Sequence, residues 1–177
     1  MRAIWLTGFG APEVLVAGDA EDPVPGPGQA LVDVAFANIT FVETQFRASG
    51  KGPFAGALPM IPGNGVGGVV SAVGAGVDPA LVGRRVVSST GGRGGYAERA
   101  AVDAAGAIPV PDGLALDAAV ALLADGRTAT LLVRAGAPRP GERVLVEAAA
   151  GGVGTLLVQL ARAAGAPVVA AAGGERK

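Results

Sequence analysis

The sequence predicts a chain in two parts, with an all-β, barrel-like first domain followed by the start of a parallel α/β domain. Short apolar runs separated by glycine and proline turns dominate the chain up to about Leu114, a pattern typical of antiparallel strands. From there on, helical and strand patterns alternate, which favours a parallel sheet. A glycine-rich turn at residues 149–154 lies between a predicted strand and a predicted helix, as in nucleotide-binding units. We therefore expect domains at residues 1–116 and 117–177.

Composition bounds the chemistry that this chain can perform. Half of the 177 residues are hydrophobic and only 16% are charged, which favours a buried core over disorder. The formal net charge is −1 and no basic run precedes Arg176, which argues against nucleic acid as the main partner. The 177 residues contain no cysteine and no histidine. They therefore cannot form a zinc site from thiolates or imidazoles, and they cannot supply a cysteine or histidine for catalysis.

In the first domain, the turns determine where strands are expected. The proline- and glycine-rich segment 23–28 ends one strand and starts the next. Phe41 and Phe46 fit a short helical turn that Thr40 or Asn38 could cap. The many glycines at the start of the following strand indicate that other groups approach its backbone closely. Strands are expected at residues 3–6, 14–16, 29–37, 69–74, 84–87 and 96–102.

Two helices are expected before the glycine turn. The first covers residues 117–124 and is broken by Asp125 and Gly126. The second begins with Thr128 as its N-cap and runs to Arg134.

The glycine turn organises the last part of the chain. The strand before it, residues 143–147, is rich in valine, which suits burial on both faces. The turn itself, residues 149–154, fits G-x-G-x-x-G with alanine in the first glycine place, so a pyrophosphate could approach its backbone. The following helix points its positive end at the turn, is expected to end at Gly165, and leads to a strand at residues 168–172. The alternative interpretation is that the glycines only let helix and strand pack closely.

The second strand bears on which dinucleotide is bound. Sites for NAD usually place Asp or Glu about 20 residues beyond the glycine turn, where it binds the ribose 2′-hydroxyl. Here residues 170–174 are alanine and glycine, and Arg176 and Lys177 follow. Small residues near cations suit a 2′-phosphate, so NADPH is the predicted cofactor. Glu175 could reach a ribose hydroxyl, and this acid is the evidence for NAD as the alternative cofactor.

Four motifs occur together in the order of a known superfamily. They are residues 83–86 (GRRV), 94–98 (GGYAE), 118–129 with its GRTA ending, and 142–154. The chain thereby resembles the medium-chain dehydrogenase/reductase superfamily along its whole length, and looks most similar to the zinc-free, zeta-crystallin-like quinone oxidoreductases. The resemblance implies a GroES-like β-barrel domain followed by the first β-α-β part of a Rossmann domain.

The resemblance also implies an activity and a set of cofactor contacts. The implied reaction is hydride transfer from NADPH to a quinone, an enone or a similar conjugated carbonyl. Because the chain lacks histidine and cysteine, we expect the proton to come from water or a hydroxyl such as that of Thr40. No catalytic residue and no metal ligand is assigned, and the two threonines below could also be only helix caps. The implied contacts are Thr40 and Thr128 at the nicotinamide, Gly151, Gly152 and Val153 at the pyrophosphate, and Gly173 and Lys177 at the 2′-phosphate.

The chain departs from the family pattern at two places. Zinc-dependent relatives carry a cysteine where Thr40 stands and Gly-His-Glu where residues 63–65 read Gly-Asn-Gly. The quinone oxidoreductases usually have Asn-x-x-Asp where this chain has Thr40 and Glu43. We expect Glu43 to stabilise the first turn of its helix through the helix dipole. Asn64 is expected to be a turn residue with positive φ, and Tyr96 is expected to have a structural role.

The predicted Rossmann domain stops after its second strand, so its sheet is expected to have open edges and open apolar faces. Three explanations remain open: a truncated reductase, a sheet completed by a second chain, or a non-catalytic binding or assembly module. An enoyl-thioester reductase of the same superfamily is the enzymatic alternative. The N-terminus has no signal-peptide pattern and the small-residue run at 148–158 cannot span a bilayer. A cytoplasmic location without a membrane partner is therefore expected. We also expect a homodimer with a small-molecule substrate and without a nucleic acid partner.

Overall fold

The computed structural model describes residues 1–54 and 56–174 and divides into two compact units, Met1–Leu123 and Ala124–Lys177. The division falls within one helix, α2 (Leu116–Gly136), whose two halves belong to different units. The domain boundary near Leu116 stays a prediction, and each unit is described by itself.

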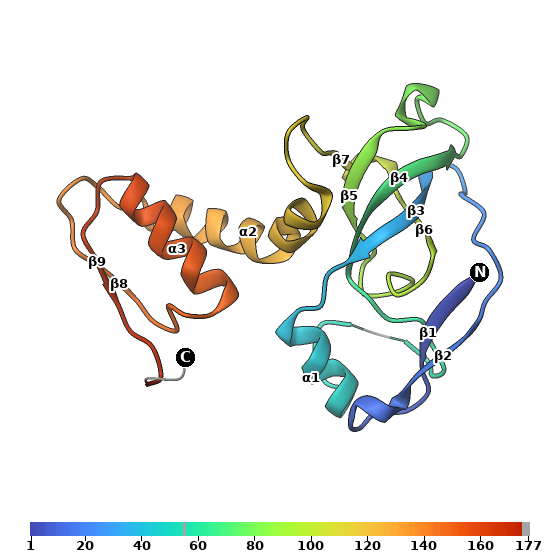
Figure 1. Ribbon diagram of the computed structural model, residues 1–177, viewed down its shortest axis with the longest axis horizontal. Coiled ribbons are helices and arrows are strands. Elements are labelled where there is room, and N and C mark those ends of the chain that lie inside the picture. Colours follow the sequence, from blue (N-terminus) through green and yellow to red (C-terminus); the bar gives the residue numbers. More distant parts are fainter. Residues whose placement is uncertain (55, 175–177) are drawn as a thin grey trace. The chain divides into compact units, whose positions relative to one another are not determined.

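The larger unit is built from antiparallel strands (Figure 1). Five strands form one sheet in the order β6-β3-β4-β5-β7, and β1 pairs with β2. Isolated bridges, such as that between Ala3 and Ala97, connect the strand pair to the rest of the unit. The strands are β1 (Arg2–Leu6), β2 (Leu15–Asp19), β3 (Gln29–Ala37), β4 (Gly65–Val73), β5 (Arg85–Ser89), β6 (Arg99–Asp103) and β7 (Ile108–Pro109), and the 3-10 turns are η1 (Pro12–Val14), η2 (Pro79–Leu81) and η3 (Ala104–Gly106).

The core of this sheet follows from the alternation of side chains along its strands. Val32 of β3 is fully buried and lies opposite Val70 of β4 on one side and Ala100 of β6 on the other. Cross-strand contacts between β-branched and small apolar side chains stabilise such a sheet. The same buried cluster also contains Ala30, Val66, Val86 and Val102.

The glycines of β4 let other groups reach its backbone, as the sequence predicted. A Cβ atom placed on Gly68 would lie 1.9 Å from the carbonyl oxygen of Asp33. A Cβ on Gly67 would lie 2.2 Å from Cγ2 of Val120, a buried residue of α2. The register of β3 against β4 shifts between Val34 and Phe36, which marks a β-bulge beside Gly68.

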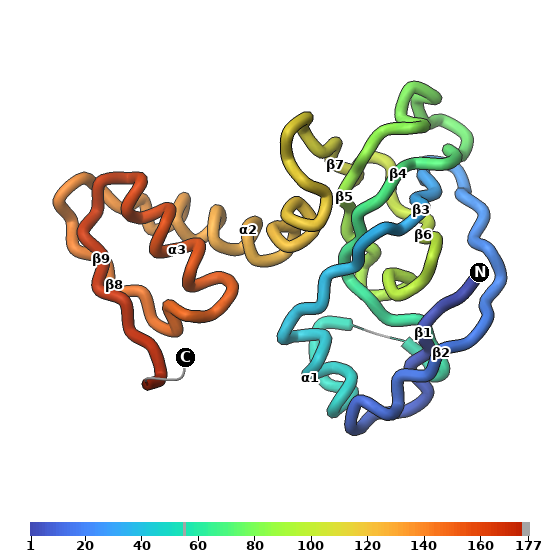
Figure 2. The backbone as a smooth tube through the Cα atoms, viewed as in Figure 1, coloured from blue at the N-terminus to red at the C-terminus, as the bar shows by residue number. Residues whose placement is uncertain are grey.

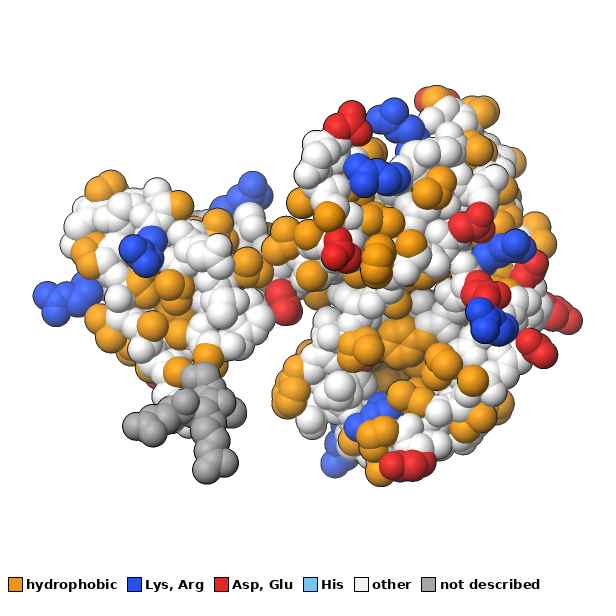
Figure 3. Space-filling model, in the orientation of Figure 1, with side chains coloured by type: hydrophobic (Ala, Val, Ile, Leu, Met, Phe, Trp, Pro, Cys, Tyr) orange, Lys and Arg blue, Asp and Glu red, His pale blue; other side chains and the backbone are white. Residues whose placement is uncertain are grey.

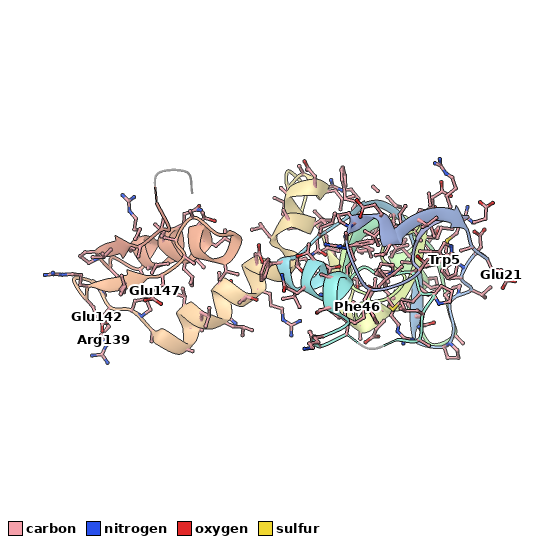
Figure 4. All side chains as sticks on the ribbon, turned by 90° about the horizontal axis from the view of Figure 1, so that it is seen from below. Trp5, Glu21, Phe46, Arg139, Glu142 and Glu147 are labelled. Atoms are coloured by element: carbon pink, nitrogen blue, oxygen red, sulfur yellow. The ribbon has the colours of Figure 1, made fainter. Side chains whose placement is uncertain are left out.

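Helix α1 (Phe41–Ser49) packs on the larger unit through one aromatic residue. Phe46 is 4% exposed and clusters with Leu6 of β1 and with Met60. It also makes edge-to-face contacts with Phe9 and Phe54, with ring centroids 5.6 Å apart in each pair. Figure 4 shows Phe46 on α1 within the side chains of this unit.

Helix α2 is continuous over 21 residues, so the break predicted at Asp125 and Gly126 is wrong. Glycine within a helix costs about 1 kcal/mol relative to alanine, and helix-forming neighbours together with the complete burial of Ala129 outweigh that cost. Thr128 therefore lies inside the helix rather than at its N-cap, and its hydroxyl donates to the carbonyl oxygen of Ala124 at 2.9 Å. Within the described residues, none of the helices combines the length and the apolar character needed to cross a membrane.

The smaller unit contains a β-α-β element, which confirms the predicted order (Figure 2). Strands β8 (Val144–Val146) and β9 (Val168–Ala170) are parallel, and α3 (Gly152–Ala163) connects them. Gly165 has φ +80° just beyond the helix, as expected of its end. The valine-rich pattern of β8 suits burial on both faces, but Leu145 is 61% exposed. This exposure agrees with the expectation that an incomplete sheet leaves apolar faces open.

Candidate cofactor-binding site

The turn between β8 and α3 is tight because backbone atoms touch within it. The N–H of Gly151 donates to the carbonyl oxygen of Ala148 at 2.9 Å, and α3 begins at the next residue. A Cβ atom on Gly154 would lie 2.2 Å from the same oxygen of Ala148. Only glycine can therefore bring the first turn of α3 this close to the end of β8.

The beginning of α3 presents backbone donors that have no partner. The N-cap residue, Gly151, has no side chain that could cap the helix. Among the described residues, no acceptor bonds the N–H groups of Gly152, Val153 and Gly154. Gly151 and Gly152 are exposed, so an anion can approach these donors from solvent. Unpaired N–H groups and the positive end of the helix dipole together favour a phosphate group here.

The loop after β9 lies at the same edge of the sheet as the glycine turn. In a parallel pair both strands end at one edge, and Ala149 donates its N–H to the carbonyl oxygen of Ala171 at 2.9 Å. Gly173 follows two residues later and is exposed. No acidic residue stands between Ala170 and Gly174, whereas the predicted contact Lys177 lies outside the described residues.

In the larger unit, Thr40 and Glu43 cap α1 reciprocally. The side chain of Thr40 accepts from the N–H of Glu43 at 3.4 Å, while the N–H of Thr40 donates to Oε2 of Glu43 at 2.7 Å. This arrangement is the capping box that S/T-x-x-E sequences predict. The hydroxyl of Thr40 also donates its hydrogen to Oε2 of Glu43 at 2.8 Å. That hydrogen is thus bonded to Glu43 in the free protein, and the expectation that Thr40 supplies a proton to substrate stays a prediction.

Glu43 is a buried carboxylate whose two oxygens accept four hydrogen bonds. Glu43 is only 7% exposed. Besides the two bonds from Thr40, Oε1 accepts from the N–H of Asn64 at 2.8 Å and from the hydroxyl of Tyr96 at 3.1 Å. The carboxylate thereby fastens α1 to two loops that are distant in sequence. Sequence reasoning missed these two partners, because only the capping box is local.

Two expectations about this cluster can be compared with the structure. The expected positive φ at Asn64 is wrong, because the left-handed residue is its neighbour Gly63, with φ +109°. Tyr96 does serve a structural contact through its hydroxyl, in line with the prediction.

Comparison with known proteins identifies the family. Residues 26–112 match the family model of the alcohol dehydrogenase GroES-like domain. The quinone oxidoreductase of Rattus norvegicus is 40% identical over 177 residues, which are 99% of this chain and 54% of that protein. The chain belongs to the medium-chain dehydrogenase/reductase superfamily, with the quinone oxidoreductases. It spans about half the length of these relatives.

Solved structures agree with this membership. The Escherichia coli quinone oxidoreductase complexed with NADPH aligns with a TM-score of 0.91 and 31% identity, over 99% of this chain and 54% of that one. The quinone oxidoreductase of Pseudomonas syringae aligns with a TM-score of 0.87 and 36% identity, over 96% and 52% of the two chains. The predicted GroES-like domain and the partial Rossmann domain of this reductase-family chain are thus confirmed.

The glycine turn of this superfamily member fits the diphosphate of a dinucleotide. Its N-terminal donors are unpaired and Gly154 allows close helix–strand packing, as described above. Thr40 and Asn64 stand where zinc-dependent relatives have ligands. Thr40 bonds to Glu43 through its hydroxyl, and Asn64 bonds to Glu43 through its backbone N–H. No set of three or more acidic, histidine or cysteine side chains in the described parts of the chain is arranged to hold a metal ion.

One side chain beside the turn was not anticipated from the sequence. A Cβ atom on Gly152 would lie 2.0 Å from Oδ2 of Asp125, so this carboxylate packs directly against the glycine. Asp125 precedes the buried Ala129 by one helical turn, which puts both on the packed side of α2. The incorrect helix break at Asp125 concealed this contact, since a residue in a loop has no predictable direction. Thr128, the predicted contact in the same helix, is exposed.

A small apolar pocket opens beside the Glu43 cluster. It has a volume of about 70 Å³ and lies between α1, β1 and neighbouring loops, where Figure 3 shows hydrophobic side chains lining a hollow. Phe46, Phe54 and Leu6 contribute apolar surface, whereas Glu43 and Tyr96 contribute polar atoms. This volume is far below the roughly 300–1,000 Å³ of ligand sites, so this pocket by itself does not enclose a substrate.

Tyr96 should resist ionisation as long as the protein is folded. Burial and the nearby Glu43 carboxylate raise the pKa of its phenol well above the usual value of about 10. Because the folded-state pKa exceeds the unfolded one, folding favours the neutral phenol. That contribution is complete below pH of about 10 and is lost as the pH rises through the folded-state pKa.

Tyr96 is the only tyrosine, so phenolate absorbance during a pH titration reports it alone. We expect ionisation to coincide with alkaline unfolding, followed in parallel by circular dichroism. In 6 M guanidinium chloride, the control, ionisation should occur near pH 10. Phenolate formation near pH 10 in the folded protein would contradict the contact with Glu43.

Replacing Ala148 by glycine should stabilise the smaller unit by about 1 kcal/mol. Ala148 has φ +50°, a left-handed conformation that costs a non-glycine residue about 1–2 kcal/mol, part of which the greater unfolded-state entropy of glycine offsets. Thermal and urea unfolding would measure the change. The matched control is Ala150→Gly in the same turn, where φ is not positive and glycine should destabilise slightly. Equal effects of the two substitutions would contradict the assigned strain.

Proposed function

We propose that this chain carries the cofactor turn and the barrel domain of an NADPH-dependent oxidoreductase that needs no zinc. The proposed reaction transfers a hydride to a quinone, an enone or a similar conjugated carbonyl. The observation that carries the proposal is the glycine turn, whose unpaired N–H groups open α3 in a chain homologous to quinone oxidoreductases. Two solved relatives, from Escherichia coli and Thermus thermophilus, are complexes with NADPH, which supports the choice of cofactor.

The backbone of the turn would hold the diphosphate. The N–H groups of Gly152 and Val153 donate to phosphate oxygens, and Gly151 leaves room for their approach. Gly173 lies at the edge of the sheet where the adenosine ribose belongs in this fold, and Lys177 is proposed as the cation for the 2′-phosphate.

Thr40 and Thr128 are proposed at the nicotinamide end, where each would accept hydrogen bonds. Both hydroxyl hydrogens are engaged, one by Glu43 and the other by the carbonyl oxygen of Ala124. Thr40 also accepts from the N–H of Glu43, which leaves one lone pair of Thr40 and both lone pairs of Thr128 available. NADPH supplies the hydride when bound. The 177 residues contain neither histidine nor cysteine, and we propose that hydrogen bonds polarise the carbonyl and that the proton comes from water or from a hydroxyl such as that of Thr40.

Calorimetric titration of the chain with NADPH and NADH tests the cofactor assignment. We expect NADPH to bind more tightly than NADH, since the residues after β9 in the described part lack an acid. In the variant Gly173→Asp, a carboxylate at this edge would repel the 2′-phosphate and accept from a ribose hydroxyl, which should reverse the preference. Absence of binding for both cofactors, or an unchanged preference in the variant, would refute the assignment for this chain.

The substrate class needs a separate measurement. NADPH oxidation by the chain would be followed with a quinone, an α,β-unsaturated ketone and an enoyl thioester. Turnover of the first two supports the proposal, whereas turnover of the thioester alone would favour an enoyl-thioester reductase. The proposed homodimer and cytoplasmic location remain predictions.

A further inference from the structure

The glycine turn already has an acidic neighbour in the smaller unit. Oδ2 of Asp125 packs against Gly152, the first residue of α3, so that a Cβ there would lie 2.0 Å from it. The carboxylate forms no hydrogen bond or ion pair within the described residues, and Asp125 is half-buried on α2. Its charge is therefore held at the turn by helix packing rather than by a bonding partner.

The Asp125 carboxylate at this position should raise the stability of α3 and lower the affinity of the turn for phosphate. A carboxylate near a helix N-terminus stabilises the helix through the dipole, and α3 has no side-chain cap of its own. The same negative charge opposes a second anion that accepts from the N–H groups of Gly152 and Val153, since both would occupy the same end of the helix. Two like charges a few ångströms apart repel appreciably even near solvent.

We infer that Asp125 sets the phosphate affinity of the glycine turn. Its charge stabilises the N-terminus of α3 in the free protein and opposes the binding of the cofactor diphosphate there. The identity of the cofactor rests on the proposed function. The repulsion between Asp125 and a bound diphosphate is expected for any molecule that contains this group. Asp125 is thus a residue that tunes affinity, and removal of its charge should tighten diphosphate binding while weakening the free protein.

The test compares Asp125→Asn and Asp125→Ala with the unmodified 177-residue chain. Inorganic pyrophosphate is titrated while the backbone amide signals of Gly152 and Gly154 are followed by NMR. Both variants should bind pyrophosphate about tenfold more tightly, equivalent to about 1.4 kcal/mol. Both should also have a Tm lower by about 1–4 °C, because the helix loses a favourable charge.

The matched control is Glu142→Gln, which changes the net charge equally. Glu142 precedes β8 at the end opposite the turn and accepts from the N–H of Arg139 at 3.0 Å, a bond that glutamine retains (Figure 4). The Glu142→Gln variant should bind pyrophosphate with the same affinity as the unmodified chain. Equal affinity of the Asp125 variants and the unmodified chain, or the absence of any amide shift with pyrophosphate, would overturn the inference.

Parallel titrations with NADPH separate this inference from the proposed function. Tighter pyrophosphate binding by the Asp125 variants without any NADPH binding would support the inference and refute the cofactor assignment. NADPH binding of equal strength in all variants, with no gain for pyrophosphate, would support the cofactor assignment and refute the inference.

Discussion

Replacing Gly68 by alanine should destabilise the larger unit by about 3 kcal/mol or more. The new Cβ would lie 1.9 Å from the carbonyl oxygen of Asp33, which belongs to the backbone of the neighbouring strand β3. A backbone atom cannot move aside as a side-chain end can, so β3 and β4 would have to separate at their bulge. Urea unfolding monitored by the fluorescence of Trp5, the only tryptophan, would measure the loss.

The control for this substitution is Gly8→Ala in the same unit. A Cβ on Gly8 meets no heavy atom within 4 Å and its φ is not left-handed, so a change within about 0.5 kcal/mol is expected. Similar stabilities for the two variants would mean that β3 and β4 are less close at Gly68 than described.

Replacing Glu43 by glutamine should cost about 2–3 kcal/mol even though the side chain keeps its shape. Each oxygen of Glu43 accepts from one backbone N–H, that of Thr40 on Oε2 and that of Asn64 on Oε1. A glutamine must direct its NH₂ group at one of these donors, whichever way its amide is turned. Because Glu43 is buried, water cannot replace the lost bond.

Glu13→Gln is the matched control, because Glu13 is an exposed acid of the same unit. Thermal unfolding should distinguish the variants clearly, with Glu13→Gln unchanged within about 0.5 kcal/mol. The Glu43→Gln protein should also protect the amide of Asn64 or of Thr40 less well against hydrogen exchange. A variant as stable as the unmodified protein would show that the carboxylate is not needed to join α1 to these loops.

Local patterns predicted the parts of the fold that depend on local physics. The strands of the barrel were predicted from short apolar runs that lie between glycine and proline turns. The β-α-β unit was predicted from the glycine turn of residues 149–154 and from Gly165. The glycines of β4 were correctly interpreted as places of close approach, although the sequence could not say that Asp33 is the neighbour of Gly68. Thr40 as the N-cap of α1 was also predictable, because capping involves residues three apart.

Features decided by tertiary packing escaped the sequence analysis. Asp125 and Gly126 are helix-weakening residues, yet burial of Ala129 keeps α2 continuous, and this changed the interpretation of Thr128. The contact of Asp125 with Gly152 joins positions 27 residues apart, and that of Glu43 with Tyr96 joins positions 53 apart. No periodicity connects such positions. The cofactor contacts of Thr40, Thr128 and Gly173 stay predictions.

The continuity of α2 has a consequence for how the smaller unit folds. Starting a helix is unfavourable because several residues must be ordered before the first hydrogen bond forms, whereas extending one adds a bond for each residue. The first half of α2 is fixed by the barrel core, where Val120 is 3% exposed and packs against Val87. The second half therefore needs no nucleus of its own and can grow from a preformed template. The barrel core can thus nucleate the part of α2 that contains Asp125, the residue that packs against Gly152 of the glycine turn.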